Sequence, residues 1–371
     1  MTTPDIPTTA PKLSCRNVWK VYGPDPSCYF STTSDTTDSA QLANRMRADG
    51  SIPAAAGVSF DVHEGEIFVI MGLSGSGKST MVRCLSRLVE PSHGEILLDG
   101  EDLLKKSKKD LIEIRRHKMG MVFQSFGLLP HLTVAENITF PLSLQGLPVK
   151  EQREKTARVI DLVGLQGRET SYPRQLSGGQ QQRVGIARSL AVEPELWFLD
   201  EPFSALDPLI RRQMQDEFLR IQSALKKSIV FITHDFLEAL RNAARMMIMR
   251  DGMVVQMGTP AELIVNPADD YVAEFTGDVP LGRVLMARDV IDPQASVQVG
   301  MPTVTATTSV DDVLALLADS KAGVIVDDDG RTTGVVTPTS VVRGLALGAD
   351  ARNEMAEGGG AADHTVREAA Q

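Results

Sequence analysis

The chain has 371 residues, of which 42% are hydrophobic, and a formal net charge of −10 at pH 7. This length suits one large domain and a smaller one, each with a packed core. The acidic balance argues against a nucleic-acid-binding protein, which normally carries a basic face. No apolar run approaches the roughly eighteen residues that cross a membrane, and the start of the chain, Met1 to Asp5, lacks the basic and apolar regions of a secretion signal.

The three cysteines, Cys15, Cys28 and Cys84, have neither the spacing of a metal site nor that of a disulfide framework. This cysteine usage fits a reducing cytoplasm. Because no apolar run is long enough to cross a membrane, we expect any membrane association of the chain to come through a partner.

Residues 1–12 are expected to form a flexible N-terminus, and residues 13–100 alternate apolar or β-branched residues with polar ones, which predicts strands. A stretch rich in Ser, Thr and Asp, residues 24–56, interrupts this alternation. Because such a composition buries little apolar surface, we expect a mobile insertion at the surface.

An apolar run over residues 67–71 predicts a buried strand, and a glycine-rich segment follows it directly. The segment has the form G-x-x-x-x-G-K-S, in which glycines let the chain curl until successive backbone N–H groups point at phosphate oxygens. The helix that begins at its end adds its positive dipole end to the same anion. The residues predicted to bind a nucleotide here are Gly72, Ser74, Gly75, Ser76, Gly77, Lys78, Ser79 and Thr80.

Helical patterning runs over residues 101–190, and we expect residues 125–190 to form a helical subdomain. Within it, a Ser-Gly-Gly-Gln segment precedes a helix predicted over residues 180–190. The N–H groups at a helix N-terminus favour anions, so this segment is a second candidate phosphate contact. Its residues are Ser177, Gly178, Gly179 and Gln180.

Apolar strands predicted over residues 196–200 and 229–233 are each followed by a residue that can take part in chemistry. The first strand ends in Asp200 and is followed by Glu201, and the second is followed by His234. A lone Glu or His is usually a solvated surface residue. Here each comes directly after a buried strand, at the carboxyl edge where α/β sheets bind ligands, so we interpret them as site residues.

Residues 191–275 alternate strands and helices, with a hairpin turn predicted at residues 251–252. The segment 277–282, which contains Gly and Pro, predicts a linker. Residues 283–348 predict a small α+β domain, and residues 349–371, with three consecutive glycines, predict a disordered tail.

The order of these motifs over roughly residues 13–270 resembles that of the ATP-binding subunits of ABC transporters. The resemblance implies an α/β P-loop NTPase fold, with a RecA-like core, an antiparallel β subdomain and the helical subdomain, which binds ATP and Mg²⁺ and hydrolyses ATP. It also adds residues to the site. Tyr22 matches the aromatic residue on which the family stacks adenine, Gln124 matches the glutamine that senses the γ-phosphate and magnesium, and Asp207 lies in the loop that joins the two ATP sites of a dimer.

The residue types suit this chemistry. ATP carries a dense negative charge, so the loop N–H groups and the Lys78 ammonium neutralise its phosphates as charge shifts in the transition state. Mg²⁺ prefers oxygen ligands, and its expected ligands are Ser79, Gln124 and Asp200. The resemblance implies that Glu201 polarises the attacking water and that His234 binds the γ-phosphate. The expected catalytic residues are Glu201, His234, Lys78 and Gln124.

In this family the phosphate loop and the Ser-Gly-Gly-Gln segment of one chain do not meet. The resemblance therefore implies a head-to-tail homodimer, in which each ATP lies between Lys78 of one chain and Ser177 of the other. Opening and closing of this dimer would do work on transmembrane permease subunits at the cytoplasmic face of the cell membrane, with a substrate-binding protein acting indirectly. Residues 124–132 are expected in the groove that receives a permease helix, with packing of this loop against the core as the alternative.

Three segments, residues 68–74, 122–126 and 203–211, resemble more closely the subunit that energises uptake of glycine betaine, proline or choline. The alternatives are an importer subunit for another small solute such as an amino acid, a soluble ABC ATPase not coupled to transport, and a regulatory adenine-nucleotide sensor. An ABC ATPase acting on DNA or ribosomes would predict a basic groove, a long coiled coil, a Cys-x-x-Cys hook or two cassettes, and the sequence has none of these. The intact Glu201 argues against a sensor.

Residues 283–348 are similar to a single CBS motif, with a helix over 310–317, strands over 324–326 and 334–337, and a helix over 340–347. Such motifs work in pairs, so the resemblance implies pairing with the motif of another subunit.

The adenosine-binding members of the CBS family have Thr or Ser followed three positions later by Asp, whereas here Thr337 is followed by Ser340. This departure weighs against ribose recognition. Two roles therefore stay open for the segment: a structural or dimer-stabilising one, and a regulatory one that senses ionic strength or a nucleotide.

Overall fold

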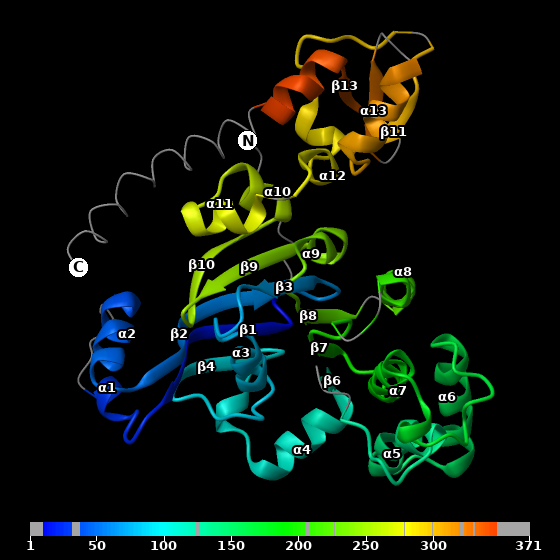
Figure 1. Ribbon diagram of the computed structural model, residues 1–371. Helices are drawn as coiled ribbons and strands as arrows, with labels where there is room; N and C mark the ends of the chain where they lie inside the picture. Colours follow the sequence, from blue (N-terminus) through cyan, green and yellow to red (C-terminus); the bar gives the residue numbers. More distant parts are fainter. Residues whose placement is uncertain are drawn as a thin grey trace, which may run out of the picture. The chain divides into compact units, whose positions relative to one another are not determined.

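The computed structural model describes residues 10–31, 38–123, 127–204, 206, 208–225, 227–277, 279–298, 300–319, 323–328 and 331–346. Two compact units make up the chain (Figure 1). The first contains residues 1–234 and 242–254, and the second contains residues 235–241 and 255–371. Among the helices of the described part, none has the length and apolar character needed to cross a membrane.

An antiparallel sheet in the first unit has the strand order β2-β1-β4-β5. Its strands are β1 (Leu13–Tyr22), β2 (Ile52–Val62), β4 (His93–Leu98) and β5 (Glu101–Asp102). Strands β1 and β2 pair from Leu13↔Val62 to Tyr22↔Ile52, so the segment between residues 22 and 52 begins and ends at one corner of the sheet.

A second sheet has the order β10-β9-β3-β8-β7-β6. Its strands are β3 (Ile67–Met71), β6 (Met119–Val122), β7 (Leu196–Asp200), β8 (Ser228–Ile232), β9 (Arg245–Arg250) and β10 (Met253–Gly258). Strand β3 pairs in parallel with β8 and β9, and β7 pairs in parallel with β6 and β8. Every residue of β3, β7 and β8 is buried, which explains their continuous apolar runs. Because these strands are parallel, their carboxyl ends share one edge of the sheet.

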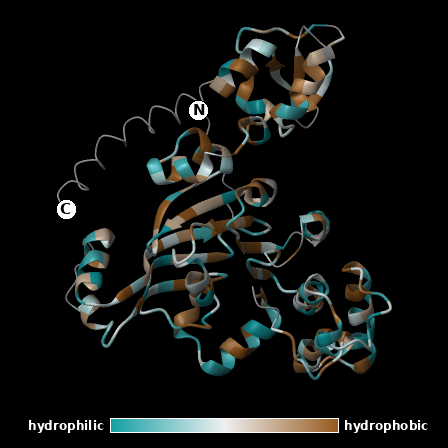
Figure 2. Ribbon diagram, viewed as in Figure 1, coloured by the Kyte–Doolittle hydropathy of each residue, from teal (hydrophilic) through white to brown (hydrophobic). Residues whose placement is uncertain are grey.

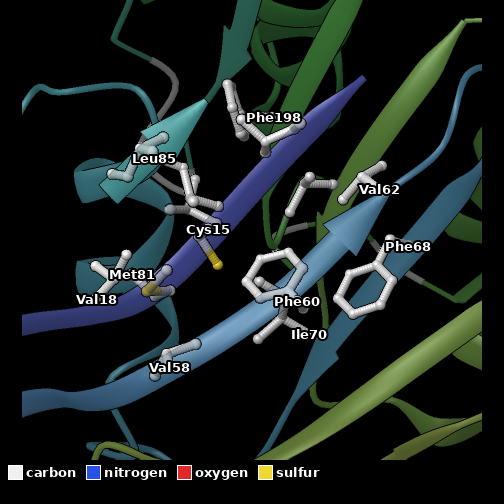
Figure 3. Close-up of a cluster of buried hydrophobic side chains, with 14 of the residues drawn as sticks. Cys15, Val18, Val58, Phe60, Val62, Phe68, Ile70, Met81, Leu85 and Phe198 are labelled. Atoms are coloured by element: carbon white, nitrogen blue, oxygen red, sulfur yellow. The ribbon is translucent and has the colours of Figure 1, made fainter. Parts of the chain in front are cut away.

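The two sheets share a hydrophobic core, shown in Figure 3. Cys15 and Val18 of β1 enter this cluster together with Phe60 of β2 and Phe68 of β3. The rings of Phe60 and Phe68 stack with centroids 4.8 Å apart. Burial of each such side chain stabilises the fold by about 1.5–3 kcal/mol, so this contact contributes substantially to the packing of β3 against the antiparallel sheet.

Six α-helices of the first unit lie outside residues 24–56 in the part of the chain that the structure describes. They are α3 (Lys78–Leu85), α4 (Lys108–His117), α5 (Val134–Leu144), α6 (Val149–Leu162), α7 (Gly178–Ala191) and α8 (Pro208–Leu225). Thr133 and Glu136 form a reciprocal capping box at the start of α5, and Ser107 caps α4. Figure 2 shows α5 to α7 with both apolar and polar residues, as expected of helices with one buried face.

The segment that we expected to be a mobile insertion forms two helices in its described residues, α1 (Cys28–Ser31) and α2 (Ser39–Ala48). Leu42, Ala43 and Met46 of α2 are buried in a cluster with Trp19 and Val21 of β1. The polar composition of residues 24–56 suggested mobility, but an apolar face of α2 covers the sheet and the polar residues of α2 lie on its exposed face.

The second unit contains α9 (Phe236–Asn242), α10 (Pro260–Val265), α11 (Asp270–Thr276), α12 (Leu281–Val284), β11 (Thr303–Thr305), α13 (Val310–Asp319), β12 (Val324–Asp328), β13 (Arg331–Val336) and a helix over residues 338–346. Its sheet has the order β11-β12-β13, with β11 parallel and β13 antiparallel to β12. Val310, Val313, Val324 and Val326 are buried in its core. This succession of elements matches the helix, strand, strand and helix predicted for the CBS-like segment, and β12 extends beyond the strand predicted over 324–326.

Candidate nucleotide site

The glycine-rich segment forms a tight loop between β3 and α3. Gly72 and Gly77 have φ angles of 143° and 97°, and a Cβ atom at these positions would lie 2.2 Å from Met249 O and 2.0 Å from Ala54 O. Glycine is therefore needed at both positions, for its conformation and for the close approach of neighbouring backbone. Gly75 has a φ of 83° and no atom within 4 Å of its Cβ position, so this part of the loop faces open space.

Lys78, the first residue of α3, directs its ammonium into this loop. Its Nζ donates hydrogen bonds to the carbonyl oxygens of Gly72 and Leu73, each at 2.8 Å. Burial lowers the pKa of Lys78 below its ordinary value, while the negative charges of Glu201 and Asp200 act in the opposite direction. The loop thus encloses a partly desolvated cation, which strengthens its attraction for a phosphate.

Ser79 and Asp200 bring two kinds of oxygen together beside the loop. Ser79 Oγ donates to Asp200 Oδ1 at 2.9 Å, and Asp200, at the end of β7, is only 1% exposed. Burial raises the pKa of Asp200 above its ordinary value, although the hydrogen bond from Ser79 opposes the shift. A hydroxyl and a buried carboxylate suit Mg²⁺, which takes one or two protein carboxylates and completes its shell with water and phosphate oxygens. These two residues therefore fit the predicted ion.

Glu201 and His234 meet at the carboxyl edge of the sheet. His234 Nδ1 lies 3.4 Å from Glu201 Oε2, with the histidine side chain 59% exposed and the glutamate side chain 18% exposed. Glu201 ends the extended run of β7 with a φ of 47°, a conformation that is uncommon outside glycine, and its N–H donates to Ile232 O of β8 at 3.1 Å. Residues held in such conformations cluster at functional sites.

Tyr22 ends β1 with a largely exposed ring. Its residue exposure is 45%, and the ammonium of Lys20 lies 4.9 Å from the ring centroid. Trp19, three residues earlier in the same strand, is buried in contrast, and its Nε1 donates to Asn17 Oδ1 at 2.8 Å. The exposed tyrosine ring has the accessibility that base stacking requires.

The Ser-Gly-Gly-Gln segment caps a 14-residue helix, α7. Ser177 Oγ accepts from the Gln180 N–H at 3.3 Å, and Gln180 Oε1 accepts from the Ser177 N–H at 3.0 Å. Gly178 is exposed in the first turn and Gly179 is half-buried, so backbone at the positive end of the helix is accessible.

Two predicted site residues, Gln124 and Asp207, lie outside the described residues. Among the described residues near Asp207 in the sequence, Ser204 Oγ donates to Glu201 O at 3.0 Å, and Arg211 donates to Leu206 O at 3.3 Å.

The structure also adds residues that sequence reasoning missed. The N–H of Gly252, in the turn between β9 and β10, donates to Ser76 O of the phosphate loop at 3.1 Å. In the second unit, Thr337 Oγ1 donates to Asp292 Oδ2 at 2.8 Å, and the hydrogen bonds from the Gln294 N–H and Thr337 lower the pKa of Asp292. A carboxylate thus lies beside Thr337 although Ser340 replaces the expected Asp. These contacts link distant segments, and no local spacing indicates them.

A groove of about 450 Å³ lies between α4, β6, α5 and α7. Leu129, from the loop predicted to contact a permease, is one of its lining residues, and its N–H donates to Asn137 Oδ1 at 2.9 Å. Phe140 and Leu144 of α5 are 42% and 47% exposed there. The lining also includes Ile112, Arg115, Arg116, Met119, Gly120, Met121, Pro141, Arg188, Ser189 and Val192.

Comparison with known families gives two matches. Residues 55–204 match the family described as ABC transporter, and residues 281–347 match the CBS domain. The chain is also similar to a solved dimeric ATP-binding cassette in a post-hydrolysis state bound to ADP and phosphate. That similarity has a TM-score of 0.57 and 32% sequence identity, and covers 67% of this chain and 98% of the cassette.

Several curated proteins are similar over most of their length. The trimethylamine N-oxide transport system ATP-binding protein TmoW of Ruegeria pomeroyi is 54% identical over 88% of this chain and 95% of its own. TmoW of Pelagibacter ubique is 48% identical over 90% of this chain and 96% of its own. The glycine betaine/proline betaine transport system ATP-binding protein ProV of Salmonella typhimurium is 43% identical over 90% of this chain and 83% of its own.

Proposed function

The chain belongs to the ATP-binding subunits of ABC importers for quaternary amines and related solutes, and on that basis we propose a reaction mechanism, a dimer, a permease contact and a transported solute for it. The membership confirms the predicted family, and the fold class is confirmed with it: an ABC ATPase domain followed by a CBS domain. The subunit is an ATPase.

The observation that carries the proposed mechanism is the meeting of Glu201 and His234, 3.4 Å apart, at the sheet edge where β3 continues into the phosphate loop. In the proposal, the loop N–H groups and Lys78 bind and neutralise the β- and γ-phosphates of ATP. Glu201 polarises the attacking water, and His234 donates to the γ-phosphate.

Ser79, Asp200 and Gln124 are proposed to hold magnesium, which would neutralise negative charge on the phosphates when bound. Tyr22 is proposed to stack on adenine through its exposed ring. The buried Asp200 is the residue on which this part of the proposal depends most, because ionised carboxylates are costly to bury without a compensating charge.

The active form is proposed to be a head-to-tail homodimer. The N-terminus of α7, with Ser177, Gly178 and Gly179, would bind the γ-phosphate held by Lys78 of the other chain, and Asp207 would lie in the loop between the two sites. The dimeric state of the similar solved cassette, which is bound to ADP and phosphate, supports a dimer.

The groove between α4, α5 and α7 is proposed to receive a short helix of a transmembrane permease at the cytoplasmic face of the membrane. Phe140 and Leu144 offer an exposed apolar surface, and Arg115 and Arg188 line the same groove. An amphipathic helix with a carboxylate at one end would match this combination. A substrate-binding protein would act on the permease and not on this chain.

The transported solute is proposed to be trimethylamine N-oxide, with glycine betaine as the second candidate. The two relatives named for trimethylamine N-oxide are 54% and 48% identical over 88% and 90% of this chain. Relatives named for glycine betaine reach 50% identity over only 68% of this chain, and the one that covers 90% of it is 43% identical.

Reconstitution of the chain with its permease and binding protein in proteoliposomes tests this proposal. ATP-dependent uptake of labelled trimethylamine N-oxide is expected to exceed that of glycine betaine, choline, proline and other amino acids. The Lys78→Ala complex serves as the control for ATP dependence. Uptake of an amino acid alone would contradict the proposed solute, and the absence of any ATP-driven uptake would contradict the role in transport.

A further inference from the structure

The insertion is tied to the strand that carries the exposed tyrosine. It leaves the antiparallel sheet after Tyr22 and returns at Ile52, and these two residues are paired across β1 and β2. Ser51 closes the insertion: its N–H donates to Met46 O at 2.8 Å, and a Cβ on Gly23 would lie 2.5 Å from Ser51 Oγ. The end of β1 is therefore held by the insertion.

Helix α2 of the insertion is fixed on the sheet by apolar packing. Leu42 and Met46 are 7% and 0% exposed, in one cluster with Trp19 and Val21 of β1. A helix held in this way can position a side chain that extends from its end.

Arg47, in the last turn of α2, is that side chain. Its guanidinium donates to Asp251 O at 2.6 Å and to Asn44 Oδ1 at 2.9 Å. Asp251 and Gly252 form the tight turn between β9 and β10, with φ angles of 52° and 82°. The second of these bonds holds the guanidinium on its own helix, and the first connects the helix to the turn.

The Asp251–Gly252 turn is hydrogen-bonded to the phosphate loop. The Gly252 N–H donates to Ser76 O at 3.1 Å, and the Ala56 N–H donates to Gly252 O at 2.8 Å. Ser76 O and the N–H of Gly77 belong to the same planar trans peptide and point in opposite directions. A hydrogen bond that fixes the carbonyl on the outside of the loop therefore aims the N–H of Gly77 away from the turn.

We propose that Arg47 is a positioning residue for nucleotide binding, which acts through the Asp251–Gly252 turn on the Ser76–Gly77 peptide. The inference rests on the proposed phosphate loop. It predicts an effect on nucleotide affinity and not on the hydrolytic step, because Glu201 and His234 follow β7 and β8 and are not part of this set of contacts.

The test compares Arg47→Met with Arg45→Met in the full-length protein. Arg45 lies on the exposed face of the same helix, so its replacement makes the same change in charge and chemistry. Calorimetric titration with ATP and ADP gives Kd, and steady-state hydrolysis gives KM and kcat. Arg47→Met is expected to raise Kd and KM about 5- to 30-fold, which is less than the full loss of a charged hydrogen bond because the contact acts through the turn, with kcat within about two-fold of wild type. Arg45→Met is expected to leave all three unchanged, and Arg47→Lys to recover part of the affinity.

Asn44→Ala removes the hydrogen bond between Asn44 and the Arg47 guanidinium and is expected to give a smaller rise in Kd. Because Asn44 is exposed, this variant still tests the inference if Arg47→Met does not fold. An unchanged Kd in Arg47→Met would overturn the inference, and so would a lower binding stoichiometry at an unchanged Kd. In either case, ATP binding by the wild type would still support the proposed phosphate loop. Absence of ATP binding by the wild type would overturn both.

Discussion

His234 Nδ1 lies 3.4 Å from Glu201 Oε2, and the two residues follow neighbouring parallel strands whose register pairs Asp200 with Ile232. The N–H of Glu201 also donates to Ile232 O at 3.1 Å. The pairing of β7 with β8 therefore brings Glu201 and His234 close together, and both strands are buried in the sheet. The backbone of Glu201 is thus fixed to the neighbouring strand directly after β7 ends, which favours a precise geometry at this side chain.

Glu201→Gln is expected to slow ATP hydrolysis by roughly 10²–10⁴, because an amide cannot act as the general base. ATP binding is expected to persist, so the variant should elute as an ATP-dependent dimer in gel filtration. The exposed Glu154 on α6 provides the matched control, Glu154→Gln, with wild-type turnover expected. Near-wild-type turnover in Glu201→Gln would remove this residue from its proposed role.

Lys78→Ala and Ser177→Arg are both expected to abolish hydrolysis, for different reasons. The first removes the charge inside the phosphate loop, and the second places a bulky cation at the N-terminus of α7. A mixed dimer of the two variants retains one undamaged composite site in the head-to-tail arrangement. It should hydrolyse ATP faster than either homodimer, and mixed dimers with no more activity than the homodimers would count against the trans arrangement or the independence of the sites.

Asp200→Asn is expected to abolish most hydrolysis and to raise the melting temperature at neutral pH. Burial raises the pKa of Asp200, so in the window just above the ordinary carboxylate pKa the folded state holds a proton that the unfolded chain lacks. The stability contributed by this group therefore falls as pH rises through that window, and at neutral pH the ionised carboxylate is destabilising. Asparagine keeps the acceptor for Ser79 without the charge.

Melting curves of wild type and Asp200→Asn between pH 4 and 8, without divalent cations, test this sign. The increase in melting temperature of Asp200→Asn over wild type should grow with pH and then level off. A gain that is largest at acidic pH, or a loss of stability at neutral pH, would contradict the assigned role of the buried charge.

Leu144→Asp is expected to prevent assembly with the permease while the isolated chain keeps its ATPase activity, because the change places a charge on the apolar surface of the groove. Val149→Asp is the control: Val149 is 61% exposed on α6 and does not line the groove. Co-purification with the permease and uptake in proteoliposomes are the measurements. Equal losses in both variants would show that the groove has no special part in assembly.

Truncation after Thr276 is expected to keep ATP hydrolysis and transport and to change, at most, their response to salt or the stability of the complex. Val265 of α10 packs against the core of the CBS segment, so the truncated chain also needs Val265→Ser to remain soluble. Uptake is measured against ionic strength for full-length and truncated complexes. Loss of ATPase activity in a folded truncation would place the segment in the catalytic unit, and identical salt curves would leave it a structural appendage.

Local sequence was sufficient for the strands that carry the site and for the residues at their ends. The run over residues 67–71 and the strands before Glu201 and His234 are buried on both faces, so apolar residues occupy every position except the end of β7, Asp200, and the start of β8, Ser228, and the pattern is plain in the sequence. The need for glycine in the phosphate loop was likewise predictable, since it follows from backbone conformation.

Contacts between distant segments could not be predicted in this way. The packing of α2 on β1, the stacking of Phe60 on Phe68, the bond from Arg47 to Asp251 and the carboxylate beside Thr337 depend on how the chain returns to itself. A hydrogen bond to a carbonyl, in particular, leaves no trace in the sequence of its acceptor, because every residue has the same carbonyl.

The sequence by itself therefore determined the family, that of ATP-binding subunits of importers, and placed a glycine-rich loop, a carboxylate and a histidine at strand ends, where we propose the chemistry takes place. Tertiary structure alone decided how that loop is held, because the orientation of the Ser76–Gly77 peptide depends on the Asp251–Gly252 turn and on a helix far from both in the chain. Motifs follow from residue types at short spacing, whereas the orientation of a peptide plane follows from the packing of elements around it.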